Sequence, residues 1–394
     1  MLGVLDLDVR PSEGLGMFEI GSSLWTVLDV LRGLQHIFPQ VDVKYDPEST
    51  TGLTPVVLHL RPHIDLLFSA KHQRLHTICV RRLRDSAPPL VLRYRDKVLS
   101  GKDELLRRVD VSRTFGPTYQ GEDLRYPGLW FSFEDDGVGE ALGKGKAIED
   151  RKQEVKRIFI SQTLDDGQPR DALDEVLECP AMFGDVARAV ARVHEGVTLY
   201  FYPSDKRPIH VCLRETTAQD LVVDLGPPLR THYKEDDRMR IHSSKKTPEE
   251  DEEPSYFYNY FRYGIDFLIS GKTHVVEKIV LHTNIPGSPL FQRYKRCNWE
   301  IEGTPEDDED DTPPRKRFHE RFETISHFLS PREPPPSMLL DRTDDEDGVT
   351  LPSSASHCNV RLRRDRAGGV GGVAGAFGDV VLEVHSGSRR GVGE

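Results

Sequence analysis

The sequence predicts an α+β fold made of tandem units, in each of which one helix packs on an antiparallel β-sheet. The first observation behind this prediction is an internal repeat, because residues 64–71 (IDLLFSAK) match residues 265–272 (IDFLISGK) at an offset of 201 positions. Each copy reads as an apolar strand, a short polar turn and a second apolar strand, which is typical of a β-hairpin. The second observation is an apolar stripe of helical spacing upstream of each copy.

The two stripes lie on segments that also have helix-end signals. Four apolar residues fall at positions i, i+3, i+4 and i+7 in each segment, so they share one face of a helix. They are Leu24, Val27, Leu28 and Leu31 in the first segment and Ala218, Leu221, Val222 and Leu225 in the second. A serine or threonine before each stripe is a candidate N-cap. Gly226 and the two prolines after it end the second helix, because proline cannot continue a helix.

Weaker copies of the unit follow at 105–162 and near the end of the chain. Phe322, Ile325 and Leu329 repeat the helical spacing, and residues 378–384 resemble the strand after Gly264. The predicted organisation is a first α+β domain of one or two units, a second unit, an acidic linker, and a partial C-terminal unit with two disordered insertions. Their ranges are 1–165, 195–303, 304–317 and 318–394, with the insertions at 331–355 and 367–376.

The charge of the chain is concentrated in three acidic runs. The formal net charge is −12, and the runs at 249–253, 306–311 and 344–347 hold fifteen acidic residues, so the remainder carries +3. A nucleic-acid-binding protein would instead show a clustered basic face, which argues against that class. The start of the chain lacks a signal-peptide pattern, and the five cysteines form no paired framework, so we expect a reducing, cytoplasmic location.

One tetrapeptide resembles a phosphate-binding motif. Residues 270–273 read SGKT, the end of a P-loop, but that motif needs a glycine five residues before Gly271, and position 266 is Asp. The repeat also places the tetrapeptide between two strands instead of before a helix. We therefore expect a hairpin turn at this place.

Other candidate chemical groups also have structural interpretations. His72 and His76 have a spacing that brings two metal ligands together only on a helix, so we expect exposed hairpin histidines. Asp65 and Asp266 occupy matching positions in the repeat, which favours a structural role. We expect no catalytic residue, no cofactor and no metal. The alternative is a small hydrolase, which would have a deep pocket where polar groups with shifted pKa values converge.

Four segments carry a resemblance to a known family. They are the segment from SSLWTVL at Ser22 to VDVKY at Val41, YKEDDRMRIHS from Tyr233, YNYFRYGID from Tyr258, and KIVLHTNIPG from Lys278. The chain resembles the phagosome assembly factor family of eukaryotes. Twelve residues match the motif of that family and are interaction or structural candidates. They are Lys234, Asp236, Asp237, Met239, Ile241, His242, Tyr260, Gly264, Asp266, His282, Asn284 and Gly287.

The resemblance implies a non-enzymatic regulator of autophagy. Such a protein would act as a scaffold at the phagophore assembly site, together with a β-propeller partner that binds phosphoinositides. Basic clusters such as 315–317 lie beside acidic runs, which weakens any attraction to anionic lipid. We therefore expect contact with the membrane through the partner. An adaptor role in Golgi or vesicle trafficking, with Golgi association, is the alternative.

Overall fold

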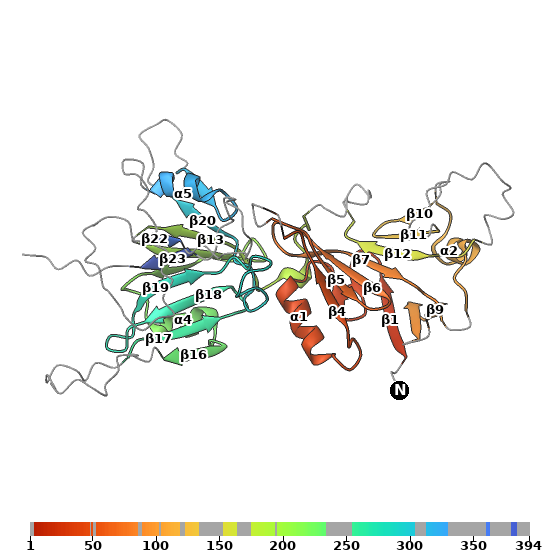
Figure 1. Cartoon of the computed structure of the whole chain (residues 1–394), viewed down its shortest axis with the longest axis horizontal. Helices are drawn as coiled ribbons and strands as arrows, with labels where there is room; N and C mark the ends of the chain where they lie inside the picture. The colour runs from red at the N-terminus through yellow and green to blue at the C-terminus, as the bar shows by residue number, and fades with distance from the viewer. Residues whose placement is uncertain are drawn as a thin grey trace, which may run out of the picture. The chain divides into compact units, whose positions relative to one another are not determined.

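The computed structural model describes residues 4–47, 49, 53–85, 89–101, 104–118, 123–133, 153–163, 175–193, 195–233, 254–303, 313–329, 360–362 and 380–383. The chain folds as two compact units, the first ending at Phe183 and the second beginning at Gly184. Figure 1 shows the elements of both units along the chain. Each unit is described by itself below.

The first unit contains two β-sheets. A five-stranded sheet has the order β3-β2-β1-β8-β9, in which β1 and β8 run parallel. A seven-stranded antiparallel sheet has the order β10-β11-β12-β7-β6-β5-β4. The strands are β1 (Leu5–Arg10), β2 (Gly14–Leu15), β3 (Phe18–Glu19), β4 (Val41–Lys44), β5 (Val56–Leu60), β6 (Ile64–Phe68), β7 (Leu75–Arg81), β8 (Leu90–Tyr94), β9 (Lys97–Ser100), β10 (Leu124–Tyr126), β11 (Leu129–Ser132) and β12 (Arg157–Ser161).

The second unit also has two sheets, and their strand order repeats that of the first unit when the seven-stranded sheet is read from β4 to β11. Its five-stranded sheet has the order β15-β14-β13-β20-β21, with β13 and β20 parallel. Its six-stranded antiparallel sheet has the order β16-β17-β18-β19-β23-β22. The strands are β13 (Val186–Arg192), β14 (Gly196–Phe201), β15 (Ile209–Cys212), β16 (Arg230–Tyr233), β17 (Tyr256–Tyr260), β18 (Ile265–Ile269), β19 (Val276–Leu281), β20 (Trp299–Glu302), β21 (Arg315–Arg317), β22 (Val360–Leu362) and β23 (Val380–Glu383).

The predicted fold class is wrong, because the structure is mostly β and is not a series of helices packed on sheets. Within its described residues the chain forms 23 strands but only four α-helices, of eight to ten residues each. Alternate strand residues, such as Leu5 and Leu7 on β1 and Ile64 and Leu66 on β6, supply most of the buried apolar side chains. A helix of this length presents too few side chains to replace a second sheet as the cover of a core.

The helices begin where the sequence predicts. Helix α1 (Leu24–Gly33) is capped by Ser23, whose Oγ accepts from the backbone N–H of Thr26 at 3.1 Å. Helix α4 (Ala218–Leu225) is capped by Thr217, whose Oγ1 accepts from Asp220 N–H at 3.2 Å. The other helices are α2 (Arg108–Phe115) and α5 (Phe322–Leu329), and η1 (Pro180–Met182) is a single 3₁₀ turn. None of the helices in the described part of the chain has the length and apolar character to cross a bilayer.

Both predicted hairpins are present, as β6–β7 and β18–β19. The weaker copies do not form sheets of their own. Strand β12, from the copy at 105–162, pairs with β7, and β23, from the last copy, pairs with β19. These segments therefore continue the two existing sheets, because the outer edge of each hairpin needs a hydrogen-bonding partner.

Part of the predicted linker is ordered. Residues 315–317 form β21, which lies beside β20. The predicted disordered insertions 331–355 and 367–376 lie outside the described residues. The proposed domain ranges stay predictions.

Three charged residues stand opposite one another across three strands of the second unit. Arg192 on β13 donates to Glu302 on β20 at 2.7 Å, and Arg315 on β21 donates to the other carboxylate oxygen at 2.6 Å. Burial raises the pKa of the Glu302 carboxyl, but the two guanidinium groups outweigh burial and hold this pKa below its ordinary value. The ionised carboxylate therefore stabilises the parallel strand pair.

Replacing this carboxylate should make the second unit less stable in a pH-dependent way. A lowered pKa stabilises the fold above the unfolded value, about 4.3 for Glu, and this contribution is lost as the pH falls through the folded pKa. We expect Glu302→Gln to lower the free energy of unfolding at pH 7 by about 1–2 kcal/mol, and by less near pH 4. Urea unfolding at both pH values measures the difference.

Glu195→Gln is the matched control, because Glu195 lies 3.9 Å from the same arginine but its side chain is 69% exposed. That variant should lose less than about 0.5 kcal/mol. An equal loss for Glu302→Gln at pH 7 and pH 4 would contradict the assignment.

Candidate functional site

The twelve motif residues divide into two groups of six. Those between Lys234 and His242 lie outside the described residues: Lys234, Asp236, Asp237, Met239, Ile241 and His242. The other six lie in the second unit, on β17 and β18, in the turn between these strands, and on the segment 282–298 that leads from β19 to β20. These are Tyr260, Gly264, Asp266, His282, Asn284 and Gly287.

Asp266 is the centre of a buried polar cluster. It lies on β18 and is 6% exposed. The Nε2 atom of His282 is 2.9 Å from its Oδ2 atom, and the hydroxyl of Tyr294 donates to the same oxygen at 2.7 Å. The His282 and Tyr294 rings stack with centroids 3.6 Å apart. The cluster therefore ties the segment 282–298 to the middle of the six-stranded sheet.

Three other motif residues, in this segment or packed against it, determine the path of its backbone. Gly264 has a φ of +70°, and a Cβ atom there would lie 2.1 Å from the carbonyl oxygen of Lys295. Asn284 has a φ of +50°, and its Oδ1 accepts from the backbone N–H of Gln292 at 2.9 Å. Gly287, at φ +84°, allows the turn after Pro286. These positions require their residue types for conformational reasons.

Two further aromatic side chains of this region are buried and form hydrogen bonds. Tyr260 is fully buried, and its hydroxyl donates to the carbonyl oxygen of Gly226 at 2.9 Å, at the end of α4. Burial raises the pKa of Tyr260 well above its ordinary value, so the phenol stays neutral. Trp299, also fully buried, donates from Nε1 to Oγ1 of Thr283 at 3.0 Å.

The first unit has a related cluster around the matching aspartate. Asp65 on β6 lies 2.7 Å from Nδ1 of His59 and 2.9 Å from Nε of Arg81. Arg81 stands 201 positions before His282, the same offset that separates the two aspartates. In both units a carboxylate on a central strand thus binds a side chain at the end of the next strand. This agrees with a structural role for the recurring aspartate.

The two remaining motif interpretations have different outcomes. Residues 270–273 lie between β18 and β19, and the backbone N–H of Thr273 bonds to Oγ of Ser270, so the SGKT tetrapeptide is a turn as predicted. His76 differs from the expectation of an exposed histidine, because it lies on β7 and is 5% exposed. Its Nδ1 is 3.0 Å from the Thr77 hydroxyl. His72 is half-buried.

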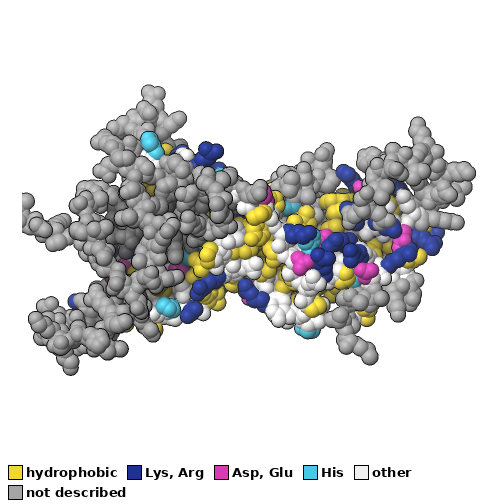
Figure 2. All heavy atoms as spheres, in the orientation of Figure 1, with side chains coloured by type: hydrophobic (Ala, Val, Ile, Leu, Met, Phe, Trp, Pro, Cys, Tyr) yellow, Lys and Arg dark blue, Asp and Glu magenta, His cyan; other side chains and the backbone are white. Residues whose placement is uncertain are grey.

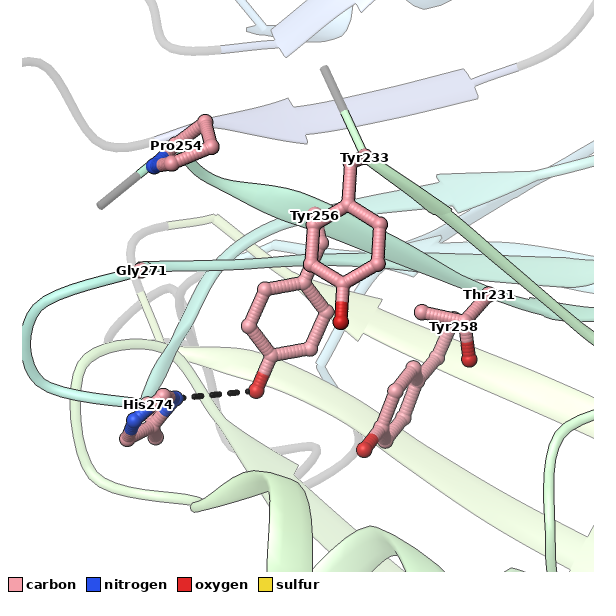
Figure 3. Close-up of a pocket in the computed structure, with 7 residues that line it drawn as sticks. All are labelled: Thr231, Tyr233, Pro254, Tyr256, Tyr258, Gly271 and His274. Atoms are coloured by element: carbon pink, nitrogen blue, oxygen red, sulfur yellow. Dashed lines mark hydrogen bonds between the residues drawn. The ribbon is translucent and has the colours of Figure 1, made fainter. Parts of the chain in front are cut away.

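A pocket of about 370 Å³ opens beside β16 and β17 in the second unit. Figure 3 shows its side chains, among which the tyrosine hydroxyls point to the same side. Two directly opposite residue pairs, Thr231 with Tyr258 and Tyr233 with Tyr256, form one wall. Tyr256 is held by a 3.0 Å hydrogen bond between its hydroxyl and Nδ1 of His274. Pro254 and Gly271 complete the lining.

Several apolar side chains on α4 and next to β16 are exposed. Val222 and Val223 on α4 are 38% and 75% exposed, Leu229 before β16 is 57% exposed, and Tyr233 is 60% exposed. The whole of β16 is exposed, and it is the terminal strand of its sheet. Sequence reasoning missed this surface. The alternation of Tyr256, Tyr258 and Tyr260 was a signal that one face of a strand bears three phenols.

The two groups of side chains differ in their chemistry. The buried groups around Asp266 bond to one another, whereas the groups around the pocket are apolar rings, phenols and one imidazole. Among the described residues, no three His, Cys, Asp or Glu side chains gather in a group that could hold a metal ion.

Comparison with known proteins identifies the family. The family model described as Phagosome assembly factor 1 matches residues 14–359. A PHAF1 protein of Arabidopsis thaliana is 30% identical over 318 residues, 76% of this chain and 76% of the relative. PHAF1 proteins of Drosophila melanogaster and Caenorhabditis elegans are 25% and 24% identical, covering 76% and 84% of this chain and 74% and 83% of their own lengths. No solved structure matches. The chain belongs to the phagosome assembly factor 1 family.

Proposed function

We propose that this protein is a non-enzymatic regulator of autophagy that acts as a scaffold at the phagophore assembly site. It works there with a β-propeller protein that binds phosphoinositides. The observation that carries the proposal is membership of the phagosome assembly factor 1 family over residues 14–359, a range that reaches into both units.

The buried motif residues support a non-enzymatic role. Asp266, His282 and Tyr294 are residue types common in acid–base catalysis, but each is at least nine-tenths buried. His282 and Tyr294 both bond to the Oδ2 atom of Asp266, and the two rings stack face to face. A general acid or base must reach the proton that it transfers in a bound substrate. The hydrogen bonds of this cluster instead hold the segment 282–298 against strand β18.

The distribution of charge supports contact with the membrane through a partner. Figure 2 shows Lys and Arg side chains on the first unit with Asp and Glu side chains among them. Examples are Arg93 with Asp6 at 2.8 Å and Arg61 with Asp42 at 2.8 Å. Paired arginines attract anionic headgroups less than isolated ones do, because the neighbouring carboxylates offset the positive potential.

The proposal makes a prediction for purified components. In liposome flotation, the full chain alone should stay at the bottom of the gradient with vesicles that contain phosphatidylinositol 3-phosphate. It should float when the β-propeller partner is added. Strong flotation of the chain alone would contradict indirect contact with the membrane.

A second prediction concerns cells. After starvation, the fluorescently tagged chain should gather in puncta with an early phagophore marker, and depletion of the β-propeller protein should disperse these puncta while the amount of tagged chain stays the same. Diffuse signal in starved cells, or puncta that persist after depletion, would contradict the proposed scaffold role.

A third prediction separates a structural from a chemical role for Asp266. Removal of its carboxylate leaves His282 and Tyr294 without their shared acceptor, so Asp266→Ala should lower the free energy of unfolding by about 2–4 kcal/mol. Asp266→Asn keeps one acceptor oxygen and should lose less. At a temperature where Asp266→Asn remains folded, it should form puncta as the wild type does.

Asp224→Ala, on the exposed side of α4, is the control and should change stability by less than about 0.5 kcal/mol. Loss of puncta in a fully folded Asp266→Asn variant would show that the carboxylate has a role beyond structure.

A further inference from the structure

Strand β16 is an edge strand with unusual exposure. In the described part of the chain it pairs with β17 alone, and all four of its side chains are exposed. Strand β4 has the corresponding place in the seven-stranded sheet of the first unit, but Val41, Asp42 and Val43 there are half-buried. Among the described residues, the side chains of this edge strand are therefore more exposed in the second unit than in the first.

The connection before the edge strand is shorter in the second unit than in the first. In the first unit, eighteen positions separate the N-cap Ser23 from the start of β4 at Val41, and this stretch includes the buried Phe38, which packs on Phe18. In the second unit, thirteen positions separate Thr217 from Arg230. The tyrosine pocket lies beside the edge strand that follows the shorter connection.

We propose that β16 and the tyrosine pocket bind an extended segment of a protein partner, which adds to the six-stranded sheet as a further strand. This inference rests on the proposed function, because it assigns a surface through which the scaffold holds a protein. The segment would pair along the free edge of β16. One of its apolar or aromatic side chains would enter the pocket between Tyr233, Tyr258 and His274.

The backbone of β16 determines the kind of partner. The outer edge of a terminal strand presents a row of N–H and C=O groups, and only another extended backbone satisfies such a row along its length. Natural edge strands are usually protected by charge, proline or a covering loop. On the pocket side, β16 presents Thr231 and Tyr233, neither of which carries a charge. An added strand would therefore meet no charged side chain of β16 on that face.

The pocket determines which side chains the segment presents. Thr231 and Tyr233 lie on one face of β16, so an added strand would place every second side chain on that face. The Tyr233 and Tyr256 rings are 5.6 Å apart, and the Tyr256 and Tyr258 rings are 5.4 Å apart, which gives aromatic walls. A leucine or an aromatic side chain fits such walls.

Selection of short random peptides on the purified full chain tests the proposal. The enriched peptides should alternate apolar and polar residues and lack a central proline. Tyr233→Lys places a charge at the rim of the pocket and should raise the Kd of an enriched peptide at least about tenfold, as loss of an aromatic anchor does. His232→Ala changes the opposite face of the same strand and should alter Kd by less than about twofold.

N-methylation of alternate peptide amides provides a readout specific for strand pairing. Two peptides are compared, each methylated on one of the two alternate sets of amides. Methylation of the set that faces β16 removes the hydrogen-bond donors and should abolish binding, whereas binding through side chains alone would survive methylation of either set. Tyr233 is 60% exposed, so Tyr233→Lys should unfold at the same temperature as the wild type.

Four outcomes would overturn the proposal. The first is that the selection enriches no peptide, and the second is that enriched peptides bind Tyr233→Lys as tightly as the wild type. The third is that both methylated peptides still bind. The fourth is that peptides bind only after residues 236–251 are replaced by a Gly-Ser linker. The last outcome would mean that the chain itself occupies the edge. A dimer of the wild type in sedimentation that dissociates in Tyr233→Lys would assign the edge to a second copy instead.

The assay in cells separates this inference from the proposed function. If starvation puncta and their dependence on the β-propeller protein are intact in Tyr233→Lys, and the peptide assay fails, then the edge assignment is wrong and the scaffold role stands. If the wild type forms no puncta, the scaffold role is wrong whatever the peptides show.

Discussion

In each unit, one parallel strand pair joins residues that are far apart in the chain. Strand β1 pairs with β8, and β13 pairs with β20, after the chain has formed the central strands of another sheet in between. Parallel pairing always needs a long crossover, and in most proteins a helix provides it. Here most of a sheet lies within the crossover, so the chain must return to its starting sheet at the right register.

The motif residues of the second unit lie where this return occurs. The segment 282–298 leaves β19 and delivers β20 to β13, and Asp266, Gly264 and Asn284 fix its path. At the far end of β20, Glu302 lies between two arginines from the neighbouring strands. A family motif can therefore mark the crossover that closes a fold, and the residues that meet a partner can lie elsewhere.

Local signals were the part of the structure that the sequence predicted well. The N-caps at Ser23 and Thr217 and both hairpins depend on neighbouring residues, and they are where expected. Long-range pairing was not predicted. The alternating LDLDVR of β1 is the signature of a half-buried strand, but no strand was predicted there from the sequence. The three consecutive basic residues 315–317 were predicted to be part of the linker. They form a strand instead, and Arg315 and Arg317 make ion pairs with Glu302 and Glu300 on β20.

The candidate site was predicted less well than the fold elements. Asp266 and His282 were recognised from the motif, but a single sequence cannot distinguish a buried structural pair from an interaction site. The tyrosine pocket depends on the register of β16 against β17, which places Tyr233 opposite Tyr256. No local pattern in the sequence reports that register.

The burial of Trp299 has a practical consequence for experiments on this chain. The sequence contains three tryptophans, and Trp25 and Trp130 both precede Gly184. Trp299 is thus the sole indole of the second unit, and it is enclosed and bonded to Thr283. With the two earlier indoles changed to phenylalanine, the wavelength of the remaining emission would follow the opening of one unit alone, without any attached dye.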